Sequence, residues 1–217
     1  MNKNNIWFIA DLHLGHKNIL FHQSNRIEAM SLKDDKDIEG HDSYIVKTWL
    51  SQTKENDHIY VLGDMIMGSQ EFAMRVLNRL KSNGCKIHLL VGNHDKSIRR
   101  MTNMFESIDL IKRVVFKKNE FEFLDADFEV ILSHYPFKSW EGKCRGSMML
   151  YGHVHDNALW IDEDEDLCLN VGIDNPLFEC QLVSLEEVYE IYLRKLNGDT
   201  PKEYLKKITE KNKFFIK

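Results

Sequence analysis

Short apolar runs that end abruptly in polar residues are the feature that most restricts how this chain can fold. In the clearest case, Leu-Leu-Val at residues 89–91 indicates a buried strand and is followed at once by Gly-Asn-His-Asp at residues 92–95. In an open α/β sheet, the loop at the carboxyl end of a strand is where binding and catalytic sites are built. A core strand can end in any polar residues, so the meaning of this strand end depends on how the other strands end.

Four further apolar runs end in the same kinds of residue. They are followed by Asp11 and His13, by Asp64, by His134, and by His153 and His155. Strand ends that point the same way meet at one rim of a sheet, and Asp, Asn and His bind borderline divalent metals through oxygen and nitrogen. With Asn93 added, seven ligands are too many for one tetrahedral ion. They suit two ions that share a bridging carboxylate and lie about 3.5–4 Å apart.

Each motif also has an ordinary structural interpretation. Residues 11–13 can form a turn with a surface histidine, Asn93 can cap a helix, and His134 can be a core histidine. Residues 153–155 are more specific, because alternate residues of an extended segment project to the same side and can chelate together. Five of the ten histidines follow apolar runs in this way, which chance does not readily arrange. We therefore interpret the five strand ends jointly as one metal site.

The first half of the chain alternates predicted strands with predicted helices. Apolar residues at helical spacing follow Asp42 and Ser69, each a candidate helix cap, and Ser97 can cap a short third helix. These helices lie between and after the first three apolar runs. The order strand, helix, strand, helix, strand predicts a parallel sheet with right-handed crossovers.

The second half has shorter connections. We expect strands there at residues 110–116, 121–124, 128–132, 148–151, 167–171 and 181–183. Such closely spaced strands indicate antiparallel pairs. Ser-Leu-Glu-Glu at residues 184–187 is a capping box that predicts a helix to about Leu196, and Thr-Pro-Lys-Glu at residues 200–203 repeats the signal. Three prolines and no Ser/Gly-rich tract argue against a flexible linker, so we expect one domain over residues 1–217, with C-terminal helices at about 185–217.

Charge and composition exclude several classes of partner. A net charge of −5 gives no global attraction to nucleic acid or to anionic membrane. The apolar run at the amino terminus is too short for a signal peptide or a membrane span, and four cysteines without C-x-x-C spacing indicate reduced thiols in a cytosolic protein.

We interpret the lysines of the last 25 residues as a solvated helix face, with a nucleic-acid patch as the alternative. The acidic run at residues 162–166 indicates a solvated loop. We expect a cytoplasmic protein that does not bind membrane.

The order of the motifs resembles a known family. Asp-x-His, then Gly-Asp, then Gly-Asn-His-Asp, then a lone His, then Gly-His-x-His span residues 6 to about 175. This order is similar to that of the calcineurin-like metallophosphoesterase superfamily, in particular its small bacterial and phage members. The resemblance implies an α/β fold, a four-layer α/β/β/α sandwich of two mixed sheets, with a dinuclear metal centre between their rims.

The resemblance also assigns roles to the strand-end residues. It implies two groups of metal ligands and a bridge: Asp11, His13 and His155 for one ion, Asn93, His134 and His153 for the other, and Asp64 between them. His94 would act on the substrate phosphate or the leaving group, and Asp95 would orient His94. We expect two divalent metal ions as cofactors; manganese is favoured, and nitrogen and oxygen ligands also admit iron, zinc, nickel or cobalt.

The segment beyond the first ligand pair supplies candidates for substrate binding. Arg26 can hold a phosphate bidentately and His16 can approach the metal rim; a solvated helix and loop is the alternative. The run 63–68, Gly-Asp-Met-Ile-Met-Gly, lacks the acidic residue and arginine that protein phosphatases of this superfamily carry after Gly-Asp, so a protein Ser/Thr phosphatase is disfavoured.

We therefore predict a dinuclear metal-dependent phosphoesterase, in which a metal-bridging hydroxide attacks a phosphomonoester or phosphodiester. The expected partner is a small phosphate ester or nucleotide, and nucleic acid is not favoured. Two alternatives remain, a nuclease of the same fold and a non-catalytic protein-binding scaffold. A scaffold should have lost ligands or His94, and this chain keeps all of them.

Overall fold

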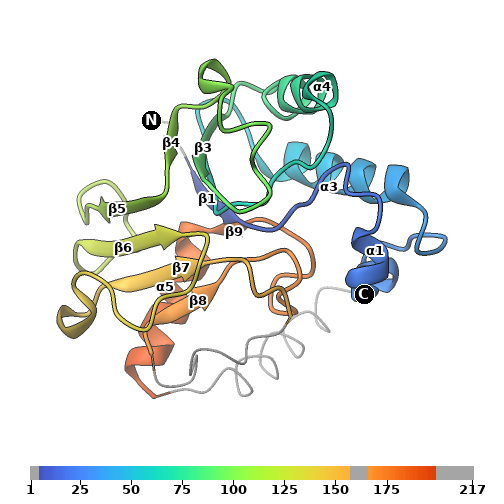
Figure 1. The fold of residues 1–217 in the computed structure, drawn as a ribbon. Helices are drawn as coiled ribbons and strands as arrows, with labels where there is room; N and C mark the ends of the chain where they lie inside the picture. The colour runs from blue at the N-terminus through green and yellow to red at the C-terminus, as the bar shows by residue number, and fades with distance from the viewer. Residues whose placement is uncertain (1–4, 157–165, 199–217) are drawn as a thin grey trace, which may run out of the picture.

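The first of two mixed β-sheets carries the amino-terminal half of the chain (Figure 1). The computed structural model describes residues 5–156 and 166–198. The strand order of this sheet is β4-β3-β2-β1-β9, with bounds β1 (Ile6–Ile9), β2 (His58–Val61), β3 (Lys86–Leu90), β4 (Ser107–Asp109) and β9 (Val183–Ser184). The strands β1, β2 and β3 are parallel, as predicted; β4 is parallel to β3, and β9 is antiparallel to β1. The short strand β4 was not predicted.

The second sheet has the order β5-β6-β7-β8, with bounds β5 (Ile111–Phe116), β6 (Phe128–Ser133), β7 (Met148–Tyr151) and β8 (Cys168–Asn170). The prediction of antiparallel pairs is right for β5 with β6 and wrong for β6 with β7 and β7 with β8, which are parallel. Parallel neighbours need a connection of a dozen or more residues, and the segments after β6 and β7 are long enough to provide it.

Residues 121–124, predicted as a strand, form turns instead. The ring of Phe121 packs edge-on against Phe116, with 5.9 Å between the ring centroids. Phe123 and Tyr189 are also in ring contact, at 6.3 Å. The apolar residues of this segment therefore pack against neighbouring rings without joining a sheet.

Two long helices, α3 (Ile38–Gln52) and α4 (Gln70–Leu80), cover the outer face of the first sheet. Ser69 caps α4 as predicted, its hydroxyl accepting a hydrogen bond from the Phe72 amide. The predicted cap at Asp42 is wrong. Helix α3 begins one turn earlier, because the Asp37 carboxylate accepts the Gly40 amide at 3.1 Å, while Asp42 lies inside the helix and accepts the Gly15 amide at 3.0 Å.

The short helices α1 (Ile19–His22) and α2 (Asn25–Ala29) lie beside this layer, near the amino end of α3 (Figure 1). The short helix expected from Ser97 is a series of turns followed by a 3₁₀ turn at Thr102–Met104.

One hydrophobic core lies between the first sheet and its helices, and another lies between the two sheets, with helix α5 (Leu185–Leu196) packed into it. Ser184 and Glu187 form the predicted capping box at the start of α5. On its outer face, the second sheet packs against Trp140, whose indole N–H donates to the Ser147 carbonyl at 3.1 Å. The predicted helix from residue 200 and nearly all of the predicted acidic loop lie outside the described residues. The two mixed sheets and their helices agree with the fold that the motif order implies.

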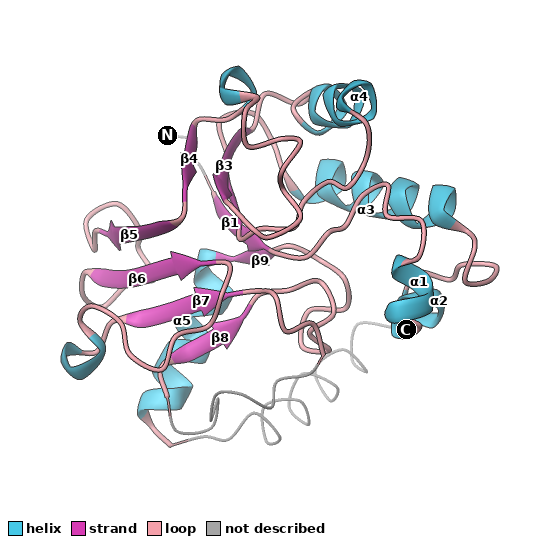
Figure 2. Ribbon diagram, in the orientation of Figure 1, coloured by secondary structure: helices cyan, strands magenta, loops and turns pink. Residues whose placement is uncertain are grey.

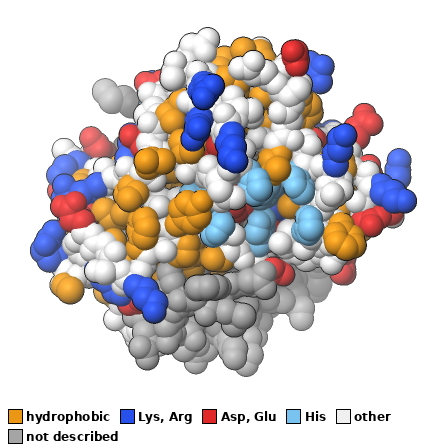
Figure 3. Space-filling view, in the orientation of Figure 1, with side chains coloured by type: hydrophobic (Ala, Val, Ile, Leu, Met, Phe, Trp, Pro, Cys, Tyr) orange, Lys and Arg blue, Asp and Glu red, His pale blue; other side chains and the backbone are white. Residues whose placement is uncertain are grey.

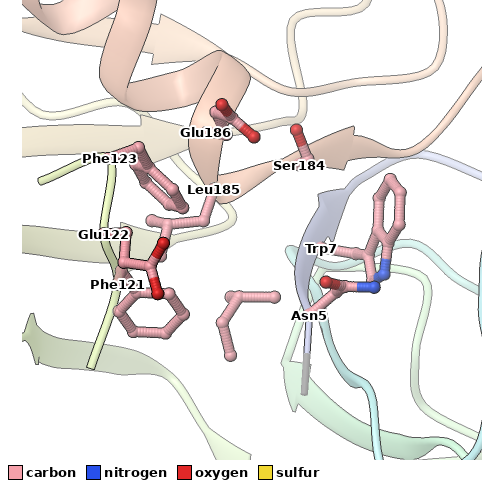
Figure 4. A pocket seen from close by; sticks show the side chains of 9 residues that line it. Asn5, Trp7, Phe121, Glu122, Phe123, Ser184, Leu185 and Glu186 are labelled. Atoms are coloured by element: carbon pink, nitrogen blue, oxygen red, sulfur yellow. The ribbon is translucent and has the colours of Figure 1, made fainter. Parts of the chain in front are cut away.

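The carboxyl ends of β1, β2, β3, β6 and β7 open on one rim. Figure 2 shows the loops that follow β6 and β7 on the side of the molecule that carries α1 and α2. A cavity of about 410 Å³ lies at the other end, against the start of β1, and is lined by Trp7, Phe121, Phe123, Ser184, Glu186 and their neighbours (Figure 4). Within the described ranges, every helix is too short or too polar to serve as a membrane span.

Candidate metal centre

The strand ends bring six of the seven predicted ligands into two groups. Within each group, one ligand atom per residue lies within 4.8 Å of the others; the groups are Asp11, His13 and His155, and Asp64, His134 and His153. The seventh, Asn93, places its side-chain oxygen 3.0 Å from Nε2 of His134. Figure 3 shows the histidines gathered in one patch on the face of the molecule.

The carboxylate of Asp64 lies between the two groups. Its Oδ2 is 3.5 Å from Nε2 of His134 in its own group and 3.7 Å from Nε2 of His13 in the other. Oδ1 of Asp11 lies 4.0 Å from Nδ1 of His134. The two groups therefore adjoin, and Asp64 occupies the position that a bridging ligand needs.

The backbone is strained where the ligands sit. Positive φ angles are rare for residues other than glycine. They occur here at Asp11 (60°), His13 (51°), Asp64 (53°), His153 (74°) and His155 (51°). Such strain costs on the order of 1–3 kcal/mol per residue and persists only where the surrounding structure imposes it. Its concentration at five of the predicted ligands indicates that the rim is shaped for a task other than stability.

Two motif glycines allow the close approach of the ligand loops. A Cβ at Gly63, where φ is +89°, would lie 2.3 Å from Nδ1 of His134, and one at Gly92 would lie 2.3 Å from Oδ1 of Asp64. Real Cβ atoms do not come this close to other atoms, so no larger residue fits without moving a ligand. The glycines in the Gly-Asp and Gly-Asn-His-Asp motifs are therefore part of the site.

The imidazole rings are oriented as metal ligands usually are. His134 and His155 each place Nδ1 beside an acceptor, the Leu62 carbonyl at 2.8 Å and the Asp174 carboxylate at 2.7 Å. With Nδ1 protonated, the Nε2 lone pair is left for a cation. Nε2 of His13 is buried and has no hydrogen-bond partner among the described residues. A buried nitrogen without a partner is costly, and a cation bound there would remove that cost.

The electrostatics of the site also fit cations. Burial raises the pKa of Asp11 to about 6 and lowers the pKa of His13 to about 2. Burial opposes ionisation of Asp64 too, but the hydrogen bond and the charge of His134 lower its pKa to about 2. Burial opposes protonation of His134 and His155 too, but the carboxylates of Asp64 and Asp174 beside them raise their pKa. The buried carboxylates thus make a site that attracts positive charge, so the donor set fits divalent metal ions.

His94 lies at the edge of this cluster. Its ring is exposed, with its centroid 5.4 Å from that of His13, and its backbone N–H donates to Oδ1 of Asp64 at 2.8 Å. This position suits contact with a substrate. His16 also lies at the rim, 5.6 Å from His13 and 6.5 Å from His94 between ring centroids, and it remains a candidate for substrate binding.

The predicted role of Asp95 needs correction, because its carboxylate is committed to backbone groups. The carboxylate is buried and accepts hydrogen bonds from the amides of Asp64 (2.9 Å), Met65 (2.8 Å) and Gly92 (2.8 Å). Asp95 thus joins two ligand loops and holds the backbone of Asp64, and does so in place of orienting the His94 ring.

The predicted role of Arg26 is also wrong. Its side chain is fully buried and its guanidinium makes a bidentate ion pair with Asp174, at 2.7 and 2.6 Å. The remaining N–H groups face Leu12, Asp11 and His41. A guanidinium with all its donors engaged inside the protein has none to offer a substrate phosphate.

Sequence reasoning missed Asp174 and Tyr135. Asp174 follows the end of β8, so the same strand-end rule, applied to one more strand, would have found it. Tyr135 follows His134 directly, and its hydroxyl donates to the side-chain oxygen of Asn93 at 3.2 Å. Its ring is 42% exposed, at the rim of the site.

The family model described as calcineurin-like phosphoesterase matches residues 5–157, a segment that contains both groups of ligands. In the search of solved structures, a protein of unknown function from Aquifex aeolicus, AQ665, has a TM-score of 0.62 and 22% sequence identity; the match covers 87% of this chain and 100% of that one. That likeness supports the fold alone.

Curated relatives come from phages and an archaeon. The Gene 66 protein of Mycobacterium phage L5 is 26% identical over 86% of this chain and 93% of its own length. The Gene 66 protein of Mycobacterium phage D29 is 24% identical over 86% of this chain and 95% of its own length. The uncharacterized protein MJ1445 of Methanocaldococcus jannaschii is 24% identical over 73% of this chain.

Proposed function

Because the chain belongs to the calcineurin-like phosphoesterase family, we propose that it hydrolyses phosphate esters with the help of two divalent cations. The observation that carries the proposal is the pair of Asp/His groups joined through Asp64. One cation would be held by Asp11, His13 and His155. The other would be held by His134, His153 and Asn93, with Asp64 shared between the two.

Two cations at these positions would supply charge that polarises the phosphoryl oxygens and would lower the pKa of the attacking water towards neutrality. The protein supplies the rest. Its buried carboxylates and imidazoles would hold the cations in place, and its strained turns orient these side chains before substrate arrives. Such prior orientation removes the cost of arranging these groups during the reaction.

His94 is the side chain best placed to act on the substrate directly. Its ring is exposed beside His13, and it lies outside both ligand groups. A protonated imidazole there can donate a hydrogen bond to a phosphoryl oxygen or a proton to the leaving oxygen. Tyr135, which is exposed and hydrogen-bonded to Asn93, would border the space that the ester occupies.

The substrate we propose is a small phosphomonoester or phosphodiester, nucleotides included, and the metal we favour is manganese. The site opens on the surface as a patch of histidines (Figure 3), so a small ester can reach it without movement of a domain. Reaction in the cytoplasm fits the cysteine pattern, because thiols without paired spacing are typical of a reducing compartment.

The test is hydrolysis of p-nitrophenyl phosphate and bis-p-nitrophenyl phosphate by the purified protein with manganese. We expect turnover that EDTA abolishes and that Asp64→Asn removes together with bound metal. Glu129→Gln, at an exposed ion pair with Arg113, is the control and should keep full activity. A folded protein that binds two ions yet hydrolyses no ester with any divalent metal would contradict the proposal and favour the scaffold reading. Cleavage of single-stranded nucleic acid alone would favour a nuclease.

A further inference from the structure

An ion pair with no exposed atoms lies directly behind one of the two ligand groups. Nε and Nη2 of Arg26 bind the two carboxylate oxygens of Asp174 at 2.7 and 2.6 Å, and both side chains are 0% exposed. The same Asp174 oxygen that meets Nη2 lies 2.7 Å from Nδ1 of His155. The pair is therefore linked to a candidate ligand by one hydrogen bond.

Arg26 also holds the backbone that carries another ligand of the same group. Nη2 donates to the carbonyl of Asp11 at 2.7 Å and Nη1 to the carbonyl of Leu12 at 3.2 Å. Nη1 also lies 3.0 Å from Nε2 of His41, whose Nδ1 is 2.9 Å from Asp42. One guanidinium thus connects the loop after β1, the loop after β8 and helix α3.

The second ligand group has a different support. Nδ1 of His134 faces the backbone carbonyl of Leu62, a neutral acceptor, and His153 is exposed. Among the described residues, the buried Arg–Asp pair adjoins only the group of Asp11, His13 and His155. The two groups are alike in their ligands and unlike in what holds those ligands.

We propose that Arg26 and Asp174 are positioning residues for one cation subsite only, the subsite formed by Asp11, His13 and His155. Asp174 fixes the His155 ring with Nδ1 protonated, and Arg26 fixes both Asp174 and the Asp11 backbone. The two cations then bind with affinities that can be changed independently, and one can be lost while the other stays. This inference rests on the cation sites of the proposed function, but it does not require that hydrolysis occur.

Removal of the carboxylate has two effects with the same sign. Asp174→Asn takes away the charged acceptor of His155, and partners of this kind change metal affinity by about 10- to 100-fold. It also leaves a buried guanidinium without its counter-charge, close enough to oppose a cation at the subsite. Arg26→Lys keeps the positive charge but loses the bidentate fork, so it should weaken the same subsite less.

The experiment titrates metal-free protein with MnCl₂ and counts bound ions by equilibrium dialysis, with electron paramagnetic resonance to distinguish paired from single Mn²⁺. We expect two ions in the wild-type protein. In Asp174→Asn we expect one ion to keep its affinity and the other to bind about 10- to 100-fold more weakly, with a single-ion spectrum at low Mn²⁺. Excess Mn²⁺ should restore the paired spectrum.

Matched variants decide which subsite is affected. His155→Ala should reproduce the single-ion spectrum, and Asp174→Asn should weaken the subsite less in that background than in the wild type, because only its charge effect remains. Glu129→Gln breaks an Arg–carboxylate pair of the same bidentate form, at 2.8 and 3.0 Å, on the exposed face and should leave both affinities unchanged. If Asp174→Asn does not fold, Arg26→Lys and the charge-neutral double variant Arg26→Gln/Asp174→Asn replace it in the same titration.

Three results would overturn the inference: equal weakening of both ions, unchanged affinity in every variant that folds, or additive losses for His155→Ala and Asp174→Asn. Activity gives an independent readout. The KM for ester should stay the same in Asp174→Asn while the Mn²⁺ needed for half-maximal rate rises; a raised KM at saturating Mn²⁺ would return Arg26 and Asp174 to substrate binding. If the wild-type protein binds two ions without hydrolysing any ester, the proposed function fails and the inference stands.

Discussion

Replacing Asp11 with asparagine should make the metal-free protein more stable at neutral pH. The Asp11 carboxyl is fully buried, and burial raises its pKa from 3.8 to about 6. A carboxyl whose pKa is higher in the folded than in the unfolded state opposes folding once it ionises. The penalty is absent well below pH 3.8, grows between pH 3.8 and about 6, and is constant above that range.

The magnitude follows from the shift. About two pKa units at 1.36 kcal/mol each give a cost of about 3 kcal/mol at pH 7, and about 1 kcal/mol at pH 4.5. Asparagine removes the charge and keeps an oxygen that can accept the His153 amide, which lies 2.9 Å from Oδ2. Metal should reverse the order of stability at a thousandfold excess of ligand over Kd, because wild-type protein then gains about 4.1 kcal/mol and the variant has lost a ligand.

The assay is urea unfolding in EDTA at both pH values, repeated at pH 7 with Mn²⁺. Asp35→Asn, at an exposed position, is the control and should change little under any condition. A variant that is less stable than wild type in EDTA at pH 7 would refute the reasoning, because the Asp11 carboxylate would then stabilise the metal-free fold. A gain of the same size at pH 4.5 and pH 7 would show that ionisation is not the cause.

Three other substitutions test the site and the fold. Gly92→Ala places a Cβ 2.3 Å from Oδ1 of Asp64, so we expect loss of bound Mn²⁺ by elemental analysis; retention of two ions would contradict this. His94→Ala should lower kcat by about 10²- to 10⁴-fold with metal content unchanged, whereas loss of metal would make His94 a ligand. Trp49→Ala empties a fully buried position on the inner face of α3 and should cost about 3–5 kcal/mol in urea unfolding; a cost below about 1 kcal/mol would be inconsistent with the packing described.

The strand ends were predictable from sequence because their signal is local. An apolar run broken by Gly, Asp or His marks both the end of a strand and a candidate ligand, and comparison of the five ends was enough to identify Asp64 and His134. The direction in which β6, β7 and β8 pair is not local. It depends on how the long segments after β6 and β7 cross the sheet, and their composition does not reveal that path.

Arg26 and Asp95 show a second limit. An arginine in a polar segment looks the same in sequence whether it reaches solvent or an ion pair, and the partner of Arg26 is 148 residues away. The family resemblance implied that Asp95 orients the ring of its neighbour His94, yet its carboxylate accepts hydrogen bonds from the amides of Asp64 and Met65. Adjacency in the chain says little about where a buried carboxylate finds its donors.

Each ligand group draws on both sheets. Asp11 and His13 follow a strand of the first sheet while His155 follows one of the second, and Asp64 belongs to the first while His134 and His153 belong to the second. A bound ion would therefore be a cross-link between the two sheets, added to the hydrogen bonds that already join them at this rim, such as that from the His153 amide to Asp11. Bound metal should couple the local opening of the two sheets and make it rarer. Amide hydrogen exchange in β2 and β6 should therefore slow in parallel as ions are added.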